Sequence, residues 1–184
     1  MFKNKRLRLL ILLLAGFIFS PVVANGQANS LGVSNGIYTA EGFGANYYFG
    51  ARYAKFFNNA HYFVEGTVGI SSLESRVLNE LSAFQVFDSN RLMTYEFVFG
   101  YDKFPAGGMP FFVMGVAGLK QGGQSKFAYV LGIGKQIPLS QFFDVKRIAV
   151  RYDIRDHIFR QQINDNQRFT SHNLSFTLGL QYYF

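Results

Sequence analysis

After residue 28, apolar and polar side chains alternate along most of the chain with a period of two. In one segment, five large apolar residues share a face: Met93, Tyr95, Phe97, Phe99 and Tyr101. Small or polar residues lie between them, from Thr94 to Asp102. A period of two is typical of a β-strand whose two faces meet different surroundings. The pattern therefore predicts strands rather than helices.

Eight segments alternate in this way or are apolar throughout. They are Asn35–Phe43, Tyr47–Phe56, Tyr62–Ser71, Met93–Asp102, Phe111–Leu119, Phe127–Gln136, Ile148–His157 and Leu174–Phe184. The apolar run Phe111–Leu119 is about half as long as a membrane helix but suits a membrane strand of about 9 to 11 residues. An even strand count is usual for bacterial barrels. We predict an all-β protein, a transmembrane antiparallel up-and-down β-barrel with eight strands.

The first 28 residues have the layout of a secretory signal peptide. A basic group comes first: Lys3, Lys5, Arg6 and Arg8. The apolar run from Leu9 to Phe19 follows and is too short to span a bilayer. Small residues allow cleavage after Ala24 or Ala28. We therefore expect a signal peptide over 1–28 and one outer-membrane β-barrel domain over 29–184.

The connections between the predicted strands differ in length. The predicted periplasmic turns are 58–61, 105–110 and 138–141, and the predicted outer loops are 72–90, 120–126 and 160–171. In the first of these loops, apolar residues recur at helical spacing: Leu73, Val77, Leu81 and Phe84. This spacing is consistent with a short amphipathic helix on the rim, and equally with strands that continue above the membrane.

Alternation alone does not show which face points inward, because a soluble barrel with an apolar lumen alternates too. Aromatic residues, however, gather near the predicted periplasmic edge: Phe56, Phe57, Tyr62, Phe63, Phe104, Phe111, Phe112, Phe142, Phe143 and Tyr182–Phe184. Such a group is typical of an interfacial girdle in a membrane barrel. We therefore expect the apolar faces to meet lipid and the polar faces to line the lumen.

A set of charged residues would then point into the lumen: Arg52, Glu65, Glu96, Asp102, Arg151, Asp153, Arg155 and His157. Eight strands enclose a space that side chains can fill, so we expect a salt-bridged polar plug and a structural or interaction role without catalysis. One alternative is a narrow ion channel. Another is a hydrolase of lipid A or peptides, in which Asp153, Asp156 and His157 would activate water.

Charge and composition exclude several other classes. The net charge is +7, but four of the eighteen basic residues and none of the eleven acidic ones precede residue 29. Fourteen basic against eleven acidic residues leave +3, which gives no reason to expect nucleic-acid binding. The chain has no cysteine, and the histidines at 61, 157 and 172 lack ligand-like spacing. We expect no disulfide, metal or cofactor.

The last eight residues resemble the insertion signal of outer-membrane barrels. The resemblance lies in a polar residue, a glycine and two alternating aromatics: Thr177, Gly179, Tyr182 and Phe184. It implies that the barrel-assembly machinery reads this strand after periplasmic chaperones deliver the chain. In size and strand layout the chain also resembles small OmpA-like and OmpX-like barrels. The segment Arg151–His157 and the last strand resemble a family of small outer-membrane β-barrel domains.

These resemblances imply a location in the cell outer membrane. The partners we expect there are outer-membrane lipids and lipopolysaccharide, and we expect a monomer. Exposed cations in the outer loops could meet lipopolysaccharide phosphates: Lys120, Lys126, Arg160 and Arg168.

Overall fold

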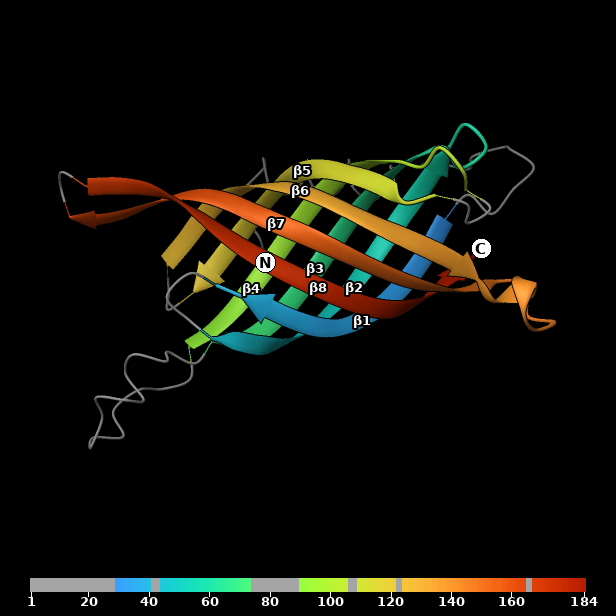
Figure 1. The fold of residues 1–184 in the computed structure, drawn as a ribbon, viewed down its shortest axis with the longest axis horizontal. Coiled ribbons are helices and arrows are strands. Elements are labelled where there is room, and N and C mark those ends of the chain that lie inside the picture. Colours follow the sequence, from blue (N-terminus) through green and yellow to red (C-terminus); the bar gives the residue numbers. More distant parts are fainter. Residues whose placement is uncertain (1–28, 41–43, 74–89, 106–108, 122–123, 165–166) are drawn as a thin grey trace, which may run out of the picture.

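Eight antiparallel strands form a closed barrel in the computed structural model, which describes residues 29–40, 44–73, 90–105, 109–121, 124–164 and 167–184 (Figure 1). The elements are β1 (Asn29–Thr39), β2 (Ala45–Phe57), β3 (Tyr62–Leu73), β4 (Asn90–Tyr101), β5 (Phe111–Gln121), β6 (Gln124–Pro138), the 3-10 helix η1 (Leu139–Gln141), β7 (Ile148–Asn164) and β8 (Gln167–Tyr183). Each strand pairs with its neighbours in sequence, and the predicted eight-stranded up-and-down barrel is confirmed. Within the described residues, no helix is long and apolar enough to cross a membrane.

The barrel closes where β1 pairs with β8. The register runs from Ser30 opposite Tyr183 to Thr39 opposite Leu174. Beyond it, Asn29 and Phe184 exchange two backbone hydrogen bonds of 3.1 and 3.0 Å. Closure leaves no unpaired strand edge, which a segment in lipid could not tolerate because hydrocarbon offers no hydrogen-bond partners. We call the end that holds Phe184 and η1 the periplasmic end, and the opposite end the outer end.

The two faces of each strand separate apolar from polar side chains. On β4, Phe97 points outward and is 53% exposed, whereas Glu96 points into the barrel and is 6% exposed. On β8, Leu178 points outward and Thr177 inward, and they are 55% and 8% exposed. A soluble barrel has the opposite arrangement. An apolar outside and a polar inside are the features of a barrel that crosses a membrane.

The first strand differs from the prediction. We expected it over Asn35–Phe43, but β1 begins at Asn29 and ends at Thr39. Its inward positions are serine and glycine up to Gly36, and Asn35 interrupts its outward apolar positions, so strand propensity and alternation are both weak here. The pairing with β8 fixes this strand, and a single sequence does not display that pairing.

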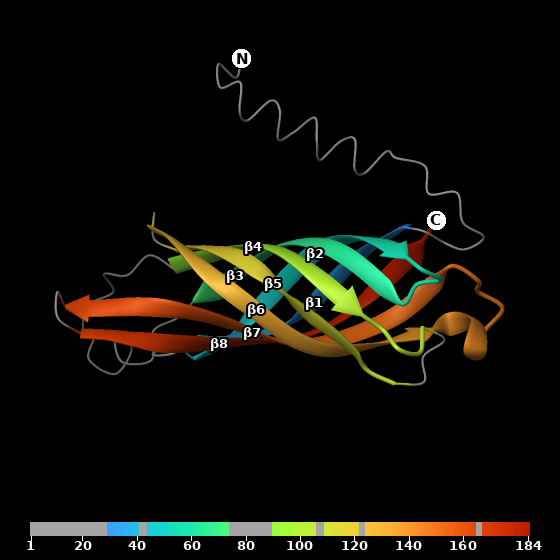
Figure 2. The same ribbon diagram turned by 90° about the horizontal axis from the view of Figure 1, so that it is seen from above.

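The last predicted outer loop is also wrong. We expected a loop over 160–171, but β7 continues to Asn164 and β8 begins at Gln167. The two strands form a long hairpin that projects past the other strands at the outer end (Figures 1 and 2). Above the membrane both faces of a strand meet water, so its residues are polar and the alternation that marks a strand disappears. The predicted signal peptide and the possible helix over 73–84, apart from Leu73 at the end of β3, lie outside the described residues.

The predicted periplasmic girdle is only partly correct. Several of its members have more than a third of their surface exposed, either on the outward face of a strand or in a connection: Tyr62, Phe104, Phe112, Phe142, Phe143, Tyr182 and Phe184. Four others point into the lumen instead: Phe56, Phe63, Phe111 and Tyr183. Neighbouring residues of a strand point to opposite faces, so a pair of consecutive aromatics such as Phe56 and Phe57 cannot both reach lipid.

Candidate functional site

The eight charged residues predicted to line the lumen all point into it in the structure. They come from β2 (Arg52), β3 (Glu65), β4 (Glu96), the residue after β4 (Asp102) and β7 (Arg151, Asp153, Arg155, His157). Each is buried, with at most 6% of its surface exposed. Four of them share β7 because residues two apart lie on one face of a strand.

Arg155 is the centre of this group. Its Nη2 donates to Oε1 of Glu65 and its Nη1 to Oε2 of Glu96, both at 2.5 Å. Its Nε donates to Oδ1 of Asp153 at 2.7 Å. One guanidinium therefore joins carboxylates from three strands. Two of these strands, β3 and β4, lie across the barrel from β7.

Two further arginines complete the group. Arg151 donates through Nη1 to Oε2 of Glu65 at 2.5 Å and through Nε to Oδ2 of Asp153 at 3.1 Å. Arg52 donates to Oδ2 of Asp153 at 2.6 Å, and its Nη2 donates to the Thr177 hydroxyl at 3.2 Å. We call Arg52, Glu65, Glu96, Arg151, Asp153 and Arg155 the lumen cluster. Its three guanidinium and three carboxylate groups cancel in charge, which allows burial in a space of low dielectric constant.

His157 lies next to the lumen cluster on its outer side. Its Nε2 is 3.1 Å from Oε1 of Glu96, and its Nδ1 is 3.3 Å from the carbonyl oxygen of Asn173. The ring also lies 5.5 Å from the ring of Tyr38, whose hydroxyl accepts a hydrogen bond from the Asn173 amide. His157 thus connects the ionic part of the lumen to an aromatic part above it.

Apolar and aromatic layers enclose the lumen cluster at both ends, and sequence reasoning missed them. The outer layer contains Tyr38, Tyr48, Leu92, Leu119 and Phe159. The periplasmic layer contains Phe56, Phe63, Phe111 and Tyr183. The Arg151 guanidinium lies 4.4 Å from the centre of the Phe111 ring and 5.5 Å from that of Phe63, as in cation–π contacts. On β2, β3, β4 and β7 a signal could have located these residues, because they lie an even number of positions from a charged residue of the same strand and so on the same face.

Asp102 lies apart from the lumen cluster, at the periplasmic mouth. We expected it to face Arg151, Asp153 and Arg155 across the lumen, but within the described residues it forms no ion pair. Its Oδ1 accepts a hydrogen bond of 2.8 Å from the Phe104 backbone instead. Burial raises the pKa of the Asp102 carboxyl above its usual range.

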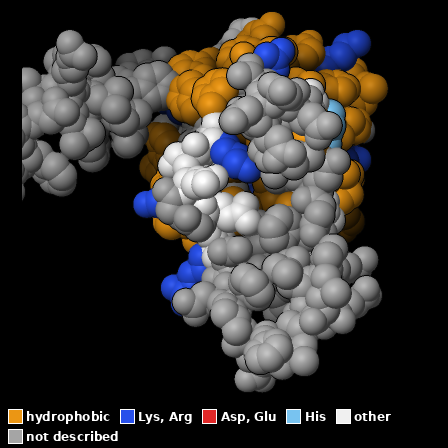
Figure 3. All heavy atoms as spheres, turned by 90° about the vertical axis from the view of Figure 1, so that its left-hand side faces the viewer, with side chains coloured by type: hydrophobic (Ala, Val, Ile, Leu, Met, Phe, Trp, Pro, Cys, Tyr) orange, Lys and Arg blue, Asp and Glu red, His pale blue; other side chains and the backbone are white. Residues whose placement is uncertain are grey.

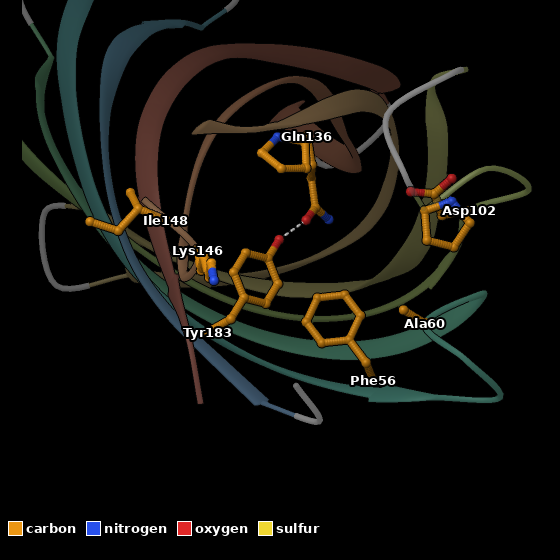
Figure 4. A pocket seen from close by; sticks show the side chains of 9 residues that line it. Phe56, Ala60, Asp102, Gln136, Lys146, Ile148 and Tyr183 are labelled. Atoms are coloured by element: carbon orange, nitrogen blue, oxygen red, sulfur yellow. Dashed lines mark hydrogen bonds between the residues drawn. The ribbon is translucent and has the colours of Figure 1, made fainter. Parts of the chain in front are cut away.

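Asp102 helps to line a cavity of about 200 Å³ at this mouth (Figure 4). Aromatic, proline and polar side chains complete its wall: Phe56, Ala60, Pro105, Gln136, Pro138, Lys146, Ile148 and Tyr183. Gln136 and Tyr183 point toward one another, and the Tyr183 hydroxyl donates a hydrogen bond to the Gln136 side chain. The cavity opens to the periplasmic side, and Phe56 and Tyr183 belong to the layer that separates it from the lumen cluster.

The structure does not assemble the residues considered for catalysis. Asp153 and His157 point into the lumen, whereas Asp156 lies on the outward face and pairs with Nδ1 of His172 at 2.7 Å. Ser175, three residues from His172, is buried and points inward. Among the described residues there is also no group of three or more side chains suited to hold a metal ion.

The four residues of the predicted insertion signal divide between the two faces of β8. Tyr182 and Phe184 point outward, and their rings stack at 6.3 Å. Thr177 faces the lumen and accepts the bond from Arg52 described above. Gly179 also faces inward, packed closely against Ser34 and the carbonyl oxygen of Val33.

Cations gather at the outer end, where Figure 3 shows Lys and Arg side chains around the rim. Arg91, Lys120 and Arg160 are exposed there. We expected Lys126 to be an exposed cation of an outer loop, but it lies on the inward face of β6. Its ammonium group is 5.3 Å from the centre of the Phe159 ring. The structure places the backbone of Arg168 in β8 but does not describe its side chain.

Comparison with known proteins finds similarity in fold alone. No protein-family model and no curated protein sequence matches the chain. Among solved structures, Neisserial surface protein A has a TM-score of 0.54 and 10% sequence identity, over 85% of this chain and 97% of that one. The N-terminal β-barrel domain of Pseudomonas aeruginosa OprF has a TM-score of 0.49, 12% identity and coverage of 87% and 100%. Ail of Yersinia pestis has a TM-score of 0.48, 14% identity and coverage of 85% and 96%.

The shared fold agrees with the surface and interior of this molecule. A closed barrel of eight antiparallel strands, with apolar side chains outside and charged ones inside, is the architecture of bacterial outer-membrane barrels. The protein is a transmembrane β-barrel of eight antiparallel strands with the fold of Neisserial surface protein A.

Proposed function

We propose that this protein is a non-conducting outer-membrane barrel with a structural or interaction role, and that it is neither an enzyme nor a channel. The observation that carries the proposal is the lumen cluster, in which every charged side chain has an oppositely charged partner within 3.1 Å. Groups that already bind one another have little capacity left for a passing ion or for substrate.

The layers on either side of the lumen cluster support the same proposal. An ion that entered from outside would meet Tyr38, Tyr48 and Leu92 before it reached the lumen cluster, and one from the periplasm would meet Phe56, Phe63 and Phe111. Apolar constrictions oppose ion passage because they offer nothing to replace the hydration shell. The interior therefore stabilises the barrel, and specific contacts are left to its outer surface.

The partners we propose follow from that surface. The exposed cations Arg91, Lys120 and Arg160 at the outer end suit the phosphates of lipopolysaccharide, and the apolar band below them suits acyl chains. During biogenesis, periplasmic chaperones and the barrel-assembly machinery would handle the chain. The outward aromatic pair Tyr182 and Phe184 supports recognition through β8.

Conductance in planar bilayers tests this proposal. We expect the wild-type protein to leave the baseline unchanged, and Arg155→Ala to produce small, brief openings because it removes three ion pairs. Arg160→Ala, an exposed cation outside the lumen, is the matched control and should remain silent. If Arg155→Ala does not fold, Glu65→Gln breaks the same network more mildly. A large and steady wild-type conductance would show that the charged residues line a working channel.

A further inference from the structure

One polar side chain interrupts the apolar outer surface near the middle of the barrel. Asn35 lies next to the centre of β1, points outward and is exposed. Its partners in the strand register are Phe49 on β2 and Leu178 on β8, which are 45% and 55% exposed. The neighbouring outward residues of its own strand are Val33 and Ile37. The Asn35 amide thus faces the region that hydrocarbon occupies.

The Asn35 side chain has no hydrogen-bond partner within the described residues, unlike several other outward polar groups of this barrel. Asp156 pairs with His172 at 2.7 Å, the Thr39 hydroxyl donates to the Leu174 carbonyl at 3.2 Å, and the Tyr53 hydroxyl donates to Asn29 at 2.8 Å. An amide in hydrocarbon without a hydrogen bond is unfavourable, and acyl chains supply neither donors nor acceptors at this depth. The Asn35 amide therefore needs a partner from another molecule.

The surface around Asn35 is shaped to receive one. A depression of about 290 Å³ lies beside it on the outward side of β7, β8, β1 and β2. Its wall is formed by short aliphatic side chains and one ring: Val33, Val150, Leu178, Leu180 and Phe49. A depression in a lipid-facing surface can receive a side chain of complementary shape from a second protein.

We propose that this face is the contact between two copies of the chain, with the Asn35 amides of the two copies hydrogen-bonded to each other. Both copies cross the membrane in the same direction, so a two-fold axis along the membrane normal brings equivalent residues together at the same depth. An asparagine amide carries a donor and an acceptor and therefore pairs with its own copy. The same axis puts β2 of one copy opposite β8 of the other, which sets Phe49 of one copy against Leu178 and Leu180 of the other.

This proposal departs from the monomer expected from the sequence, where Asn35 had been assigned to the start of the first strand. It does not depend on the state of the lumen, because all the residues involved point outward. A conducting barrel could still form this dimer, and a sealed one could still be monomeric.

Disulfide crosslinking tests the proposal, because the native chain contains no cysteine. Val33→Cys and Ile37→Cys place a thiol on either side of Asn35 without removing the amide. Val116→Cys, on β5 across the barrel and also lipid-facing, is the matched control for random collisions. In oxidised outer membranes we expect Val33→Cys to give several-fold more crosslinked dimer than Val116→Cys. Adding Asn35→Leu to Val33→Cys should lower that yield several-fold while the heat-sensitive gel migration of each barrel is retained.

Two results would overturn the proposal. Equal crosslinking at Val33→Cys and Val116→Cys would mean that β1 meets only lipid. Crosslinking that Asn35→Leu leaves unchanged would mean that the two copies meet without the amide pair. Native mass spectrometry of the cysteine-free protein provides a second readout, in which a dimer should be present for the wild type and depleted for Asn35→Leu.

Discussion

Replacing Arg155 with alanine is expected to destabilise the folded barrel by about 3 to 5 kcal/mol, because removal of one partner leaves buried charges uncompensated. Arg155 joins Glu65, Glu96 and Asp153, so three carboxylates lose a ligand at once. Water cannot readily replace the guanidinium between the aromatic layers. Urea titration of the protein refolded in lipid vesicles, with the gel migration of unheated samples as the readout, measures the change.

Arg160→Ala serves as the control for that measurement. Arg160 lies on the same strand, five residues further on, and its side chain is exposed at the outer end. An exposed arginine contributes about 1 kcal/mol or less. If the two variants unfolded at the same urea concentration, the lumen cluster would not stabilise the barrel and its role would need another explanation.

The second large effect is expected at Gly36, where β1 packs against β8 at the barrel closure. A Cβ atom at this position would overlap the carbonyl oxygen of Phe176 and lie 2.8 Å from the Cα of Thr177. Both are backbone atoms in a paired strand, so relief requires that the two strands separate. We expect Gly36→Ala to cost about 3 kcal/mol or more, at the upper end of overpacking effects, and to reduce the folded fraction after refolding.

Gly118→Ala is the matched control for this prediction. Gly118 is also in a strand, but a Cβ atom there would have no heavy atom within 4 Å. The folded fractions of both variants, read from unheated gel samples at equal lipid concentration, provide the comparison. If Gly36→Ala folded as completely as Gly118→Ala, the close approach of β1 and β8 described above would be wrong.

The parts of the fold that could be predicted are those in which one face of a strand meets lipid. Over Met93–Tyr101 of β4 and Leu174–Tyr182 of β8 the outward residues are large and apolar and most inward ones are small or polar, so alternation identifies both the strands and their faces. β1 follows this rule less well because Asn35 interrupts its apolar face, and its start was misplaced by six residues. The end of β7 has no lipid-facing side, so the same rule could not find it.

The charged residues of the site were predictable in the same way, and their partners were not. Arg151, Asp153 and Arg155 alternate with large apolar residues along β7, which places all three on the inward face. Whether Glu96 or Asp102 reaches Arg155 depends on the stagger between strands, which eight separate alternation patterns do not contain. The inward aromatics Phe63 and Phe111 were assigned to the girdle, although Phe63 lies two residues from Glu65 and so on the same face of β3. Phe111 begins β5, which is apolar on both faces. A run of apolar residues shows that a strand is buried without showing on which side.

The most direct test of the account is where the protein resides and how it migrates. The apolar outward surface predicts that the processed protein is recovered in outer-membrane fractions and needs detergent for extraction. The closed, fully paired barrel predicts different gel migration for heated and unheated samples, because such barrels resist detergent unfolding. Recovery as a soluble periplasmic protein, with identical migration before and after heating, would contradict the account.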